Sequence, residues 1–221
     1  MEYAVGEASF AGIRLYCTPD TLIPREETEL LLRVASKWVL EVQGAHEHPL
    51  ILADIGTGTG NLAIALALNT GAEKILGSDI SPAAVAVASR NVARYDLQDR
   101  VTLFCGDMLA AIKDGGYRQL DMVVCNPPYI PTASLAKLDP AILDHEPEVA
   151  LNAGAYGLDI FRSLISEAPT VLRPGGMLAF EIGHGQEKMV TLLLQRNGNY
   201  ADVQYHRDVN DVIRVISACR V

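Results

Sequence analysis

Asp54-Ile55-Gly56-Thr57-Gly58-Thr59-Gly60 is the stretch that decides the fold of this 221-residue chain. It completes an apolar run at residues 50–55, which predicts a strand, and leads into an apolar run at residues 61–69, which predicts a helix. Three alternate glycines let the backbone turn tightly and approach a ligand without obstruction by a Cβ atom. The following helix directs its free N–H groups into the same space. Such a turn is typical of a ligand site, although a plain β-α connection has the same composition.

The spacing of these glycines narrows the class of ligand. It is G-x-G-x-G, whereas the dinucleotide fingerprint is G-x-G-x-x-G. The stretch also lacks the Gly-Lys-Ser/Thr ending of a loop that grips phosphates. Asp54 precedes the turn, and a carboxylate there suits a cationic amine better than a pyrophosphate.

Strands and helices alternate along the rest of the chain. Apolar runs predict seven strands, at residues 50–55, 74–79, 101–105, 122–125, 177–182, 200–206 and 212–218. Apolar residues at helical spacing predict helices at 26–42, 61–69, 82–95, 158–172 and 186–196. This order predicts an α/β fold with a doubly wound, mostly parallel sheet covered on both faces. We expect residues 1–48 to form an N-terminal flap with a small hairpin and a helix, and residues 49–221 to form the main domain.

Composition argues against several classes of protein. Lys and Arg number 18 against 27 Asp and Glu, a net charge of −9, whereas a general nucleic-acid binder needs a basic face. No apolar run reaches the ~18–20 residues that span a bilayer, and the N-terminus has no secretory pattern. We therefore expect a cytoplasmic protein. We predict no metal site, because His46 and His48 would need two further ligands nearby.

Acidic residues follow three consecutive strands of the predicted sheet. Asp54 is placed to meet a cationic amine, Asp79 to accept hydrogen bonds from a ribose diol, and Asp107 to meet an adenine edge. Together these groups describe S-adenosylmethionine. The predicted cofactor-binding residues are Asp54, Gly56, Thr57, Gly58, Gly60, Asn61, Asp79, Ile80, Gly106, Asp107, Met108 and Asn126.

Asn126-Pro127-Pro128-Tyr129 follows the fourth strand directly. Two prolines remove two backbone donors and hold the chain stiffly, so the segment presents carbonyl oxygens without competing N–H groups. The Asn126 side-chain oxygen and the Pro127 carbonyl can then accept the two hydrogens of a substrate NH2 group. Tyr129 can stack on a planar group. Transfer of a methyl group to such a nitrogen depends mainly on orientation, so we predict Asn126, Pro127 and Tyr129 to be catalytic.

The Asn-Pro-Pro-Tyr segment resembles that of methyltransferases acting on planar NH2 groups, and flanking segments narrow the resemblance. Residues 22–29, Leu-Ile-Pro-Arg-Glu-Glu-Thr-Glu, resemble the Leu-Ile-Pro-Arg-Pro-Glu-Thr-Glu signature of the HemK/PrmC-type release-factor glutamine methyltransferases. Glu146-Pro147 with Ala150-Leu151, and Leu172-Arg173-Pro174-Gly175-Gly176 with Glu181-Ile182-Gly183, resemble two further segments of that family. The resemblance covers nearly the whole chain.

This resemblance implies a class I S-adenosylmethionine-dependent methyltransferase fold, which is Rossmann-like. It implies N5-methylation of the glutamine in the Gly-Gly-Gln loop of peptide-chain release factors. It also implies that Ile23 and Arg25 cover the ligands, which gives Ile23, Arg25, Asn126, Pro127, Pro128 and Tyr129 as substrate-binding residues.

Two departures from the family keep other acceptors open. Glu26 stands where the family has proline. We also expect the chain to correspond to the catalytic domain of the family, without its N-terminal helical domain. A small-molecule amine or amide is therefore an alternative acceptor. A nucleic-acid amino group and a catalytically silent binding protein are weaker alternatives. Two side-chain roles also stay open: Thr28 either caps a helix or lines the pocket, and Glu146 either faces substrate, with Asp144 and His145, or anchors its loop.

Overall fold

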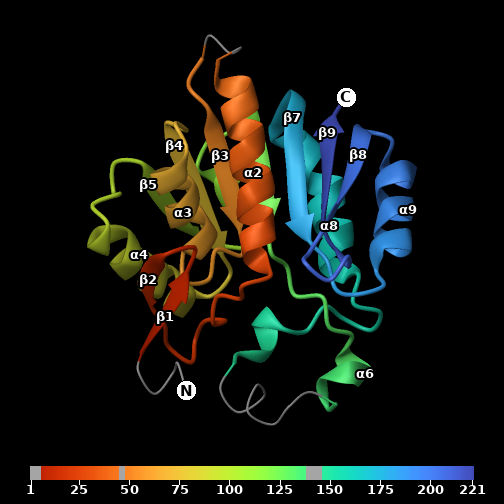
Figure 1. Ribbon diagram of the computed structural model, residues 1–221, viewed down its shortest axis with the longest axis horizontal. Helices are drawn as coiled ribbons and strands as arrows, with labels where there is room; N and C mark the ends of the chain where they lie inside the picture. The colour runs from red at the N-terminus through yellow and green to blue at the C-terminus, as the bar shows by residue number, and fades with distance from the viewer. Residues whose placement is uncertain (1–5, 45–47, 138–145) are drawn as a thin grey trace.

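The computed structural model describes residues 6–44, 48–137 and 146–221 (Figure 1). Strands β1 (Glu7–Phe10) and β2 (Ile13–Tyr16) pair antiparallel, which confirms the predicted N-terminal hairpin. Helix α2 (Thr28–Gln43) follows and buries an apolar side that includes Leu31 and Val39. The predicted helix 26–42 is therefore present, and it begins two residues later than expected.

Seven strands form a single sheet. Their spatial order is β5 (Val101–Cys105), β4 (Lys74–Asp79), β3 (Ile51–Ile55), β6 (Leu120–Cys125), β7 (Leu172–Glu181), β9 (Ile213–Arg220) and β8 (Tyr200–Arg207). The first five are parallel, and β9 runs antiparallel to both β7 and β8. This confirms the predicted mostly parallel sheet. The chain adds strands in one direction from β3 to β5 and then returns to the other side of β3 at β6, and ligands of open α/β sheets bind at such a reversal.

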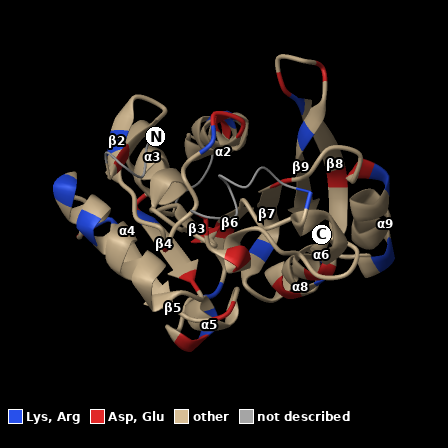
Figure 2. Ribbon diagram, turned by 90° about the horizontal axis from the view of Figure 1, so that it is seen from below, with Lys and Arg blue, Asp and Glu red and all other residues tan. Residues whose placement is uncertain are grey.

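Helices cover both faces of this sheet (Figures 1 and 2). One face carries α2, α3 (Asn61–Asn69) and α4 (Pro82–Arg94). The other face carries α5 (Ala110–Asp114), α8 (Asp159–Glu167) and α9 (Glu187–Asn197). The layered arrangement follows from strands that are apolar on both sides and need cover on both.

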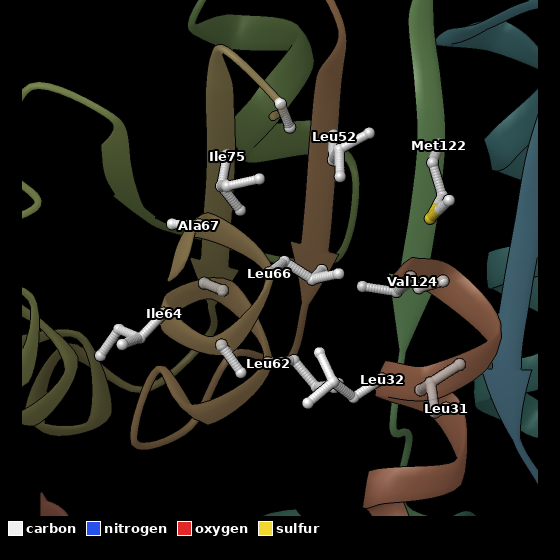
Figure 3. Packing of buried hydrophobic residues seen from close by; sticks show 14 of the residues in the cluster. Leu31, Leu32, Leu52, Leu62, Ile64, Leu66, Ala67, Ile75, Met122 and Val124 are labelled. Atoms are coloured by element: carbon white, nitrogen blue, oxygen red, sulfur yellow. The ribbon is translucent and has the colours of Figure 1, made fainter. Parts of the chain in front are cut away.

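The central strands send alternate side chains into two apolar clusters. Met122 and Val124 of β6 pack with α2 and α3, whereas Val123 and Cys125 pack on the opposite face. Figure 3 shows the first cluster, where Leu66 of α3 lies close to the strands. Helix α3 has buried residues on all sides because α2, α4 and the sheet surround it.

Local sequence signals explain two helix ends. Ser81 caps α4, since its Oγ accepts a hydrogen bond of 3.2 Å from the Ala84 N–H. Helix α8 ends at Glu167, and Pro169 lies in the following 3₁₀ turn η2 (Ala168–Thr170), so the predicted helix 158–172 is too long.

Residues 173–176 include Pro174-Gly175-Gly176, a sequence that predicts a turn, and this prediction is wrong because these residues are part of β7. Leu120 pairs with Leu172 and Met122 with Met177, so β7 takes five steps where β6 takes two. The extra residues form a bulge. Gly176 fits there because a Cβ atom would lie 2.9–3.1 Å from three backbone oxygens.

The segment after β6 carries little regular structure. It contains helix α6 (Thr132–Leu135) and the 3₁₀ turn η1 (Glu148–Ala150), and Ile130 forms a bridge with Asn152. The predicted division at residues 48 and 49 stays a prediction, although α2 packs into the same apolar cluster as α3 and the sheet. In the described part of the chain, every helix is too short or too polar to cross a membrane.

Candidate active site

A crevice of about 1100 Å³, counted with the open space at its mouth, lies at the carboxyl ends of β3, β4, β5 and β6. Figure 2 looks onto this side of the sheet. The walls come from the sheet, from the segment before α2 and from the segment after β6. The lining residues lie at 20–22, 24–25, 28, 55–59, 61–62, 78–81, 84, 107–108, 125–128, 147, 149–150 and 160.

The glycine turn forms the floor of this crevice. Gly56 and Gly58 have positive φ angles of 70° and 53°; a Cβ atom on Gly56 would point into open space, and one on Gly58 would meet only the Gly56 carbonyl oxygen, at 4.0 Å. Gly60 also has a positive φ, 82°, and a Cβ atom there would lie 3.3 Å from Ile64 and 3.4 Å from Ala88. Gly60 therefore lets α3 and α4 approach each other, whereas Gly56 and Gly58 leave room for a ligand.

Asp54 lies beneath the turn and is buried. Its Oδ2 accepts hydrogen bonds from the Thr57 hydroxyl at 2.6 Å and the Ala63 N–H at 3.1 Å. Burial raises the pKa of this carboxyl to about 6, and both hydrogen bonds oppose the rise. Asp54 does not line the crevice, so the structure shows it as a support of the turn, and its expected contact with a ligand amine stays a prediction.

Asp79 is the acidic group that lines the crevice after β4. Its carboxylate accepts one hydrogen bond from the Gly58 N–H and another from the Ser81 N–H, each 2.9 Å long. These bonds fix both oxygens while leaving further lone pairs for hydroxyl groups of a ligand. Ile80, the next residue, is half-exposed at the same wall.

Asp107 and Met108 line the crevice after β5, but Gly106 does not. A Cβ atom on Gly106 would lie 2.8 Å from the Cβ of Ala111, so this glycine allows the chain to pack against α5. The Met108 carbonyl accepts a hydrogen bond of 3.0 Å from Ser78 Oγ, which ties this loop to the end of β4.

Asn126 follows β6 and joins two other polar side chains. Its Nδ2 donates to Thr28 Oγ1 at 2.9 Å, and the Thr28 hydroxyl donates to Glu181 Oε2 at 2.7 Å. Thr28 and Glu181 are each 1% exposed. Burial raises the pKa of the Glu181 carboxyl to about 7, with a smaller opposing effect of the Thr28 hydrogen bond. Thr28 thus lines the pocket, one of its two expected roles.

A side chamber of about 610 Å³, again counted with the open space at its mouth, adjoins the crevice. The two spaces share the wall residues Leu22, Arg25, Asn126, Pro127, Pro128 and Ala150, and the chamber adds Tyr129, Ile130 and Leu151. The Tyr129 carbonyl accepts a hydrogen bond of 3.0 Å from Gln186 Nε2, and burial raises the pKa of its phenol to about 12. Tyr129 is therefore a neutral, firmly held part of the chamber.

Arg25 and Glu146 form an ion pair that joins the segment before α2 to the segment after β6. The Glu146 side chain is 3% exposed and that of Arg25 is 38% exposed. Glu146 thus anchors its loop, one of its two expected roles, while Asp144 and His145 lie outside the described residues. Ile23 is buried against Ala8 and Cys17 and does not line either space.

Several polar residues near the site could not be assigned a role from the sequence. Glu181 is one, and Asn91 is another: its Nδ2 donates to the carbonyls of Thr59 and Tyr16, which ties the glycine turn to the hairpin. For both residues, the sequence feature that could have revealed a role is a polar side chain within a run that is otherwise apolar and predicts a strand or a helix. Among the described residues, His, Cys, Asp and Glu form no group of three that could hold a metal ion, and His46 lies outside them.

Comparisons with known proteins relate the chain to methyltransferases. The model for ribosomal protein L11 methyltransferase (PrmA) matches residues 28–146. Over 216 residues the chain is 37% identical to the release factor glutamine methyltransferase of Geobacter sulfurreducens, covering 98% of this chain and 72% of that protein. It is 42% identical over 204 residues to the same enzyme of Moorella thermoacetica, covering 92% and 69%.

The chain belongs to the release factor glutamine methyltransferase family. This confirms the resemblance seen in the sequence. A solved protein-(glutamine-N5) methyltransferase (release factor-specific) from Alicyclobacillus acidocaldarius shares the fold, with a TM-score of 0.52 and 24% identity over 90% of this chain and 94% of the other. As a family member the protein is a methyltransferase, and S-adenosylmethionine is its cofactor.

The crevice fits this cofactor of the release factor glutamine methyltransferase family. It offers a carboxylate for ribose hydroxyls, a glycine turn with open space above it, and a wall after β5 for a flat base. Of the predicted cofactor residues, nine line the crevice: Gly56, Thr57, Gly58, Asn61, Asp79, Ile80, Asp107, Met108 and Asn126. Asp54, Gly60 and Gly106 instead support its walls.

Proposed function

We propose that this protein methylates the side-chain amide nitrogen of the glutamine in the Gly-Gly-Gln loop of a peptide-chain release factor. The observation that carries the proposal is the position of Asn126 and Pro127, which stand in the wall shared by the crevice and the side chamber. A glutamine amide in the chamber and a cofactor in the crevice would meet at this wall. The printed function of the relatives supports the same substrate.

The cofactor-binding roles are assigned to the residues of the crevice. Asp79 accepts hydrogen bonds from the ribose hydroxyls, and the turn at Gly56 and Gly58 takes the amino-acid part. Asp107 and Met108 hold the adenine edge. Asp54 Oδ1 has no hydrogen-bond partner, but Asp54 is buried and does not line the crevice, so its role toward the cofactor amine would be indirect unless the turn moves.

Asn126 and Pro127 form an acceptor corner, which makes the substrate nitrogen reactive by orienting it. An amide nitrogen is a poor nucleophile because its lone pair is delocalised into the carbonyl group. Asn126 Oδ1 and the Pro127 carbonyl accept its two hydrogens, which fixes the plane of the NH2 group and increases electron density on nitrogen. When bound, the cofactor supplies an electrophilic methyl group on a sulfonium. The nitrogen exchanges one hydrogen for the methyl group, and the proton leaves to solvent through the open crevice.

The residues of the chamber hold the remainder of the substrate. Tyr129 and Pro128 provide flat apolar surfaces for the glutamine side chain and its neighbours. Arg25 lines both spaces, and its ion pair with Glu146 keeps the segment before α2 next to the chamber. Ile23 supports that segment from the buried side.

Methyl transfer to a purified release factor tests this proposal. The protein, S-adenosylmethionine and a release factor are incubated, and peptides that contain the Gly-Gly-Gln loop are analysed by mass spectrometry. We expect one added methyl on the glutamine, and none when this glutamine is replaced by alanine. The absence of the methyl with folded, cofactor-binding protein would refute the release-factor substrate.

The same assay separates the alternative acceptors. Labelled methyl donor is incubated with a whole-cell extract that is then divided into protein, nucleic-acid and small-molecule fractions. The net charge of −9 argues against nucleic acid, and the printed function of the relatives argues for protein. Label confined to the small-molecule fraction would establish the alternative. A release-factor substrate would also place the enzyme in the cytoplasm, where translation occurs.

A further inference from the structure

Three side chains from distant parts of the chain form a hydrogen-bonded series beside the acceptor corner. Asn126 follows β6, Thr28 begins α2 and Glu181 ends β7. The bonds run from Asn126 Nδ2 to Thr28 Oγ1 at 2.9 Å and from Thr28 Oγ1 to Glu181 Oε2 at 2.7 Å. Thr28 and Glu181 are buried, so water does not compete for these bonds.

The chemistry of the three groups gives the series a direction. An ionised carboxylate only accepts hydrogen bonds, so the Thr28 hydroxyl must donate its one hydrogen to Glu181. Thr28 Oγ1 then acts as acceptor toward Asn126, and only the Nδ2 side of that amide can donate to it. Asn126 Oδ1 takes no part in this series, and Asn126 lines both the crevice and the chamber, so this oxygen is available to a ligand.

We propose that Thr28 and Glu181 are positioning residues, which fix the side-chain amide of Asn126 so that its oxygen, rather than its NH2 group, faces the substrate. The proposal rests on the proposed function, because it names the groups that prepare the acceptor corner for the glutamine amide. A flipped Asn126 would present a donor to the substrate NH2 group, and two donors cannot bond each other.

The charge state of Glu181 makes this series sensitive to pH. Burial raises its pKa to about 7, and Glu27 on the segment before α2 adds to the rise. Thr28, Arg214 on β9 and Tyr129 oppose it. A protonated Glu181 can donate to Thr28 Oγ1, which releases the Thr28 hydrogen toward Asn126 and removes the preference for one amide orientation.

Nuclear magnetic resonance of the full chain tests the series without any turnover. The protein is labelled with ¹⁵N-asparagine, and the Asn126 side-chain signals are assigned by their loss in Asn126→Ser. We expect these signals to shift with a midpoint near pH 7 and the shift to vanish in Glu181→Gln. The control Glu73→Gln, which changes an exposed carboxylate, should leave the titration intact. Asn126 signals that are the same in the wild type and in Glu181→Gln at every pH, or a wild-type titration that persists unchanged in Glu181→Gln, would overturn the proposal.

Methyl transfer provides the second measurement. Thr28→Val removes the hydroxyl at nearly constant volume, and we expect kcat to fall roughly 10- to 100-fold, as misplacement of a reacting group does. The KM for release factor and the Kd for S-adenosylmethionine should change much less. Thr28→Ser restores a hydroxyl and should recover most of kcat. An unchanged kcat in Thr28→Val would refute the positioning role.

The two measurements separate the possible failures. A wild-type protein that methylates no release factor would refute the proposed function, and the resonance experiment would still decide whether Glu181 and Thr28 control the Asn126 amide.

Discussion

Replacing Asp79 with asparagine tests whether the crevice binds S-adenosylmethionine through this carboxylate. The change keeps the shape of the side chain and removes its charge. Asp79 accepts one backbone N–H at each oxygen, from Gly58 and from Ser81. Asparagine has a single oxygen, so its NH2 group must face one of these two N–H groups. The substitution therefore weakens the turn and, in our proposal, removes a charged acceptor from the ribose.

The size of the effect follows from the bonds that are lost. A hydrogen bond to a charged group contributes about 1.5–3 kcal/mol, so the Kd for S-adenosylmethionine should rise about 10- to 100-fold. The unpaired backbone donor should lower the free energy of unfolding by about 1–3 kcal/mol. Isothermal titration calorimetry measures the first quantity and denaturant unfolding the second. Asp114→Asn, which makes the same change at an exposed position on α5, should alter neither.

One outcome would contradict the reasoning. If Asp79→Asn lost unfolding free energy but bound S-adenosylmethionine within twofold of the wild type, Asp79 would hold only the turn. The ribose would then have to find its acceptor elsewhere in the crevice.

Three further changes test the supports of the site. In a denaturant titration, Gly60→Ala should lower the unfolding free energy by about 1 kcal/mol or more beyond the effect of Gly116→Ala. Both positions have positive φ, but only at Gly60 would the new Cβ approach side chains of α3 and α4. Arg25→Met should cost about 2–3 kcal/mol by the same measurement, because it leaves the buried Glu146 carboxylate unpaired, and adding Glu146→Leu should recover part of this loss. Asp54→Asn should abolish a pH dependence of stability. The folded pKa of about 6 lies above the ordinary 3.8, so Asp54 contributes stability below pH 3.8 that is lost as the pH rises through 6. Relative to the wild type, the unfolding free energy of Asp54→Asn should therefore rise by up to roughly 3 kcal/mol between pH 4 and pH 8. Parallel pH profiles of the two proteins would contradict this.

The sequence predicted the sheet well because its signals are local. Strand β4 and helix α3 have the predicted bounds, since an apolar run with polar or glycine neighbours defines each of them. The glycine turn and Asn126 could also be placed from sequence alone. Each directly follows a parallel strand, and all carboxyl ends of such strands meet at one edge.

The buried contacts behind Asn126 and the course of the segment before α2 could not be predicted in the same way. Thr28 and Glu181 are 153 residues apart, and nothing in their spacing reports that their oxygens lie 2.7 Å apart. The extended segment before α2 has no periodicity either. The sequence therefore could not show that Ile23 turns into a buried cluster while Leu22 and Pro24 face the crevice.

Asp54 shows a different limit of sequence reasoning. Its position before the glycine turn was read correctly, but a carboxylate at a strand end can face a ligand or the turn itself. The structure favours the turn, because Thr57 and Ala63 follow within nine residues and supply donors to the same oxygen. The other Asp54 oxygen, Oδ1, is buried without a hydrogen-bond partner, so a ligand amine could reach it only if the turn moved.

Helix α2 explains why Asn126 is held rigidly although its hydrogen-bond partner Thr28 comes from outside the sheet. Leu31 and Val39 anchor the helix in the same apolar cluster as α3 and β6. Thr28, in the first turn of that helix, is therefore held at a fixed distance from Asn126. Any shift of α2 large enough to break this bond would also open the apolar cluster, at a cost of about 25 cal/mol per Å² of apolar surface exposed. The packing of the N-terminal helix and the orientation of the catalytic amide are thus coupled, and variants that loosen α2 in the core should reduce methyl transfer before they unfold the protein.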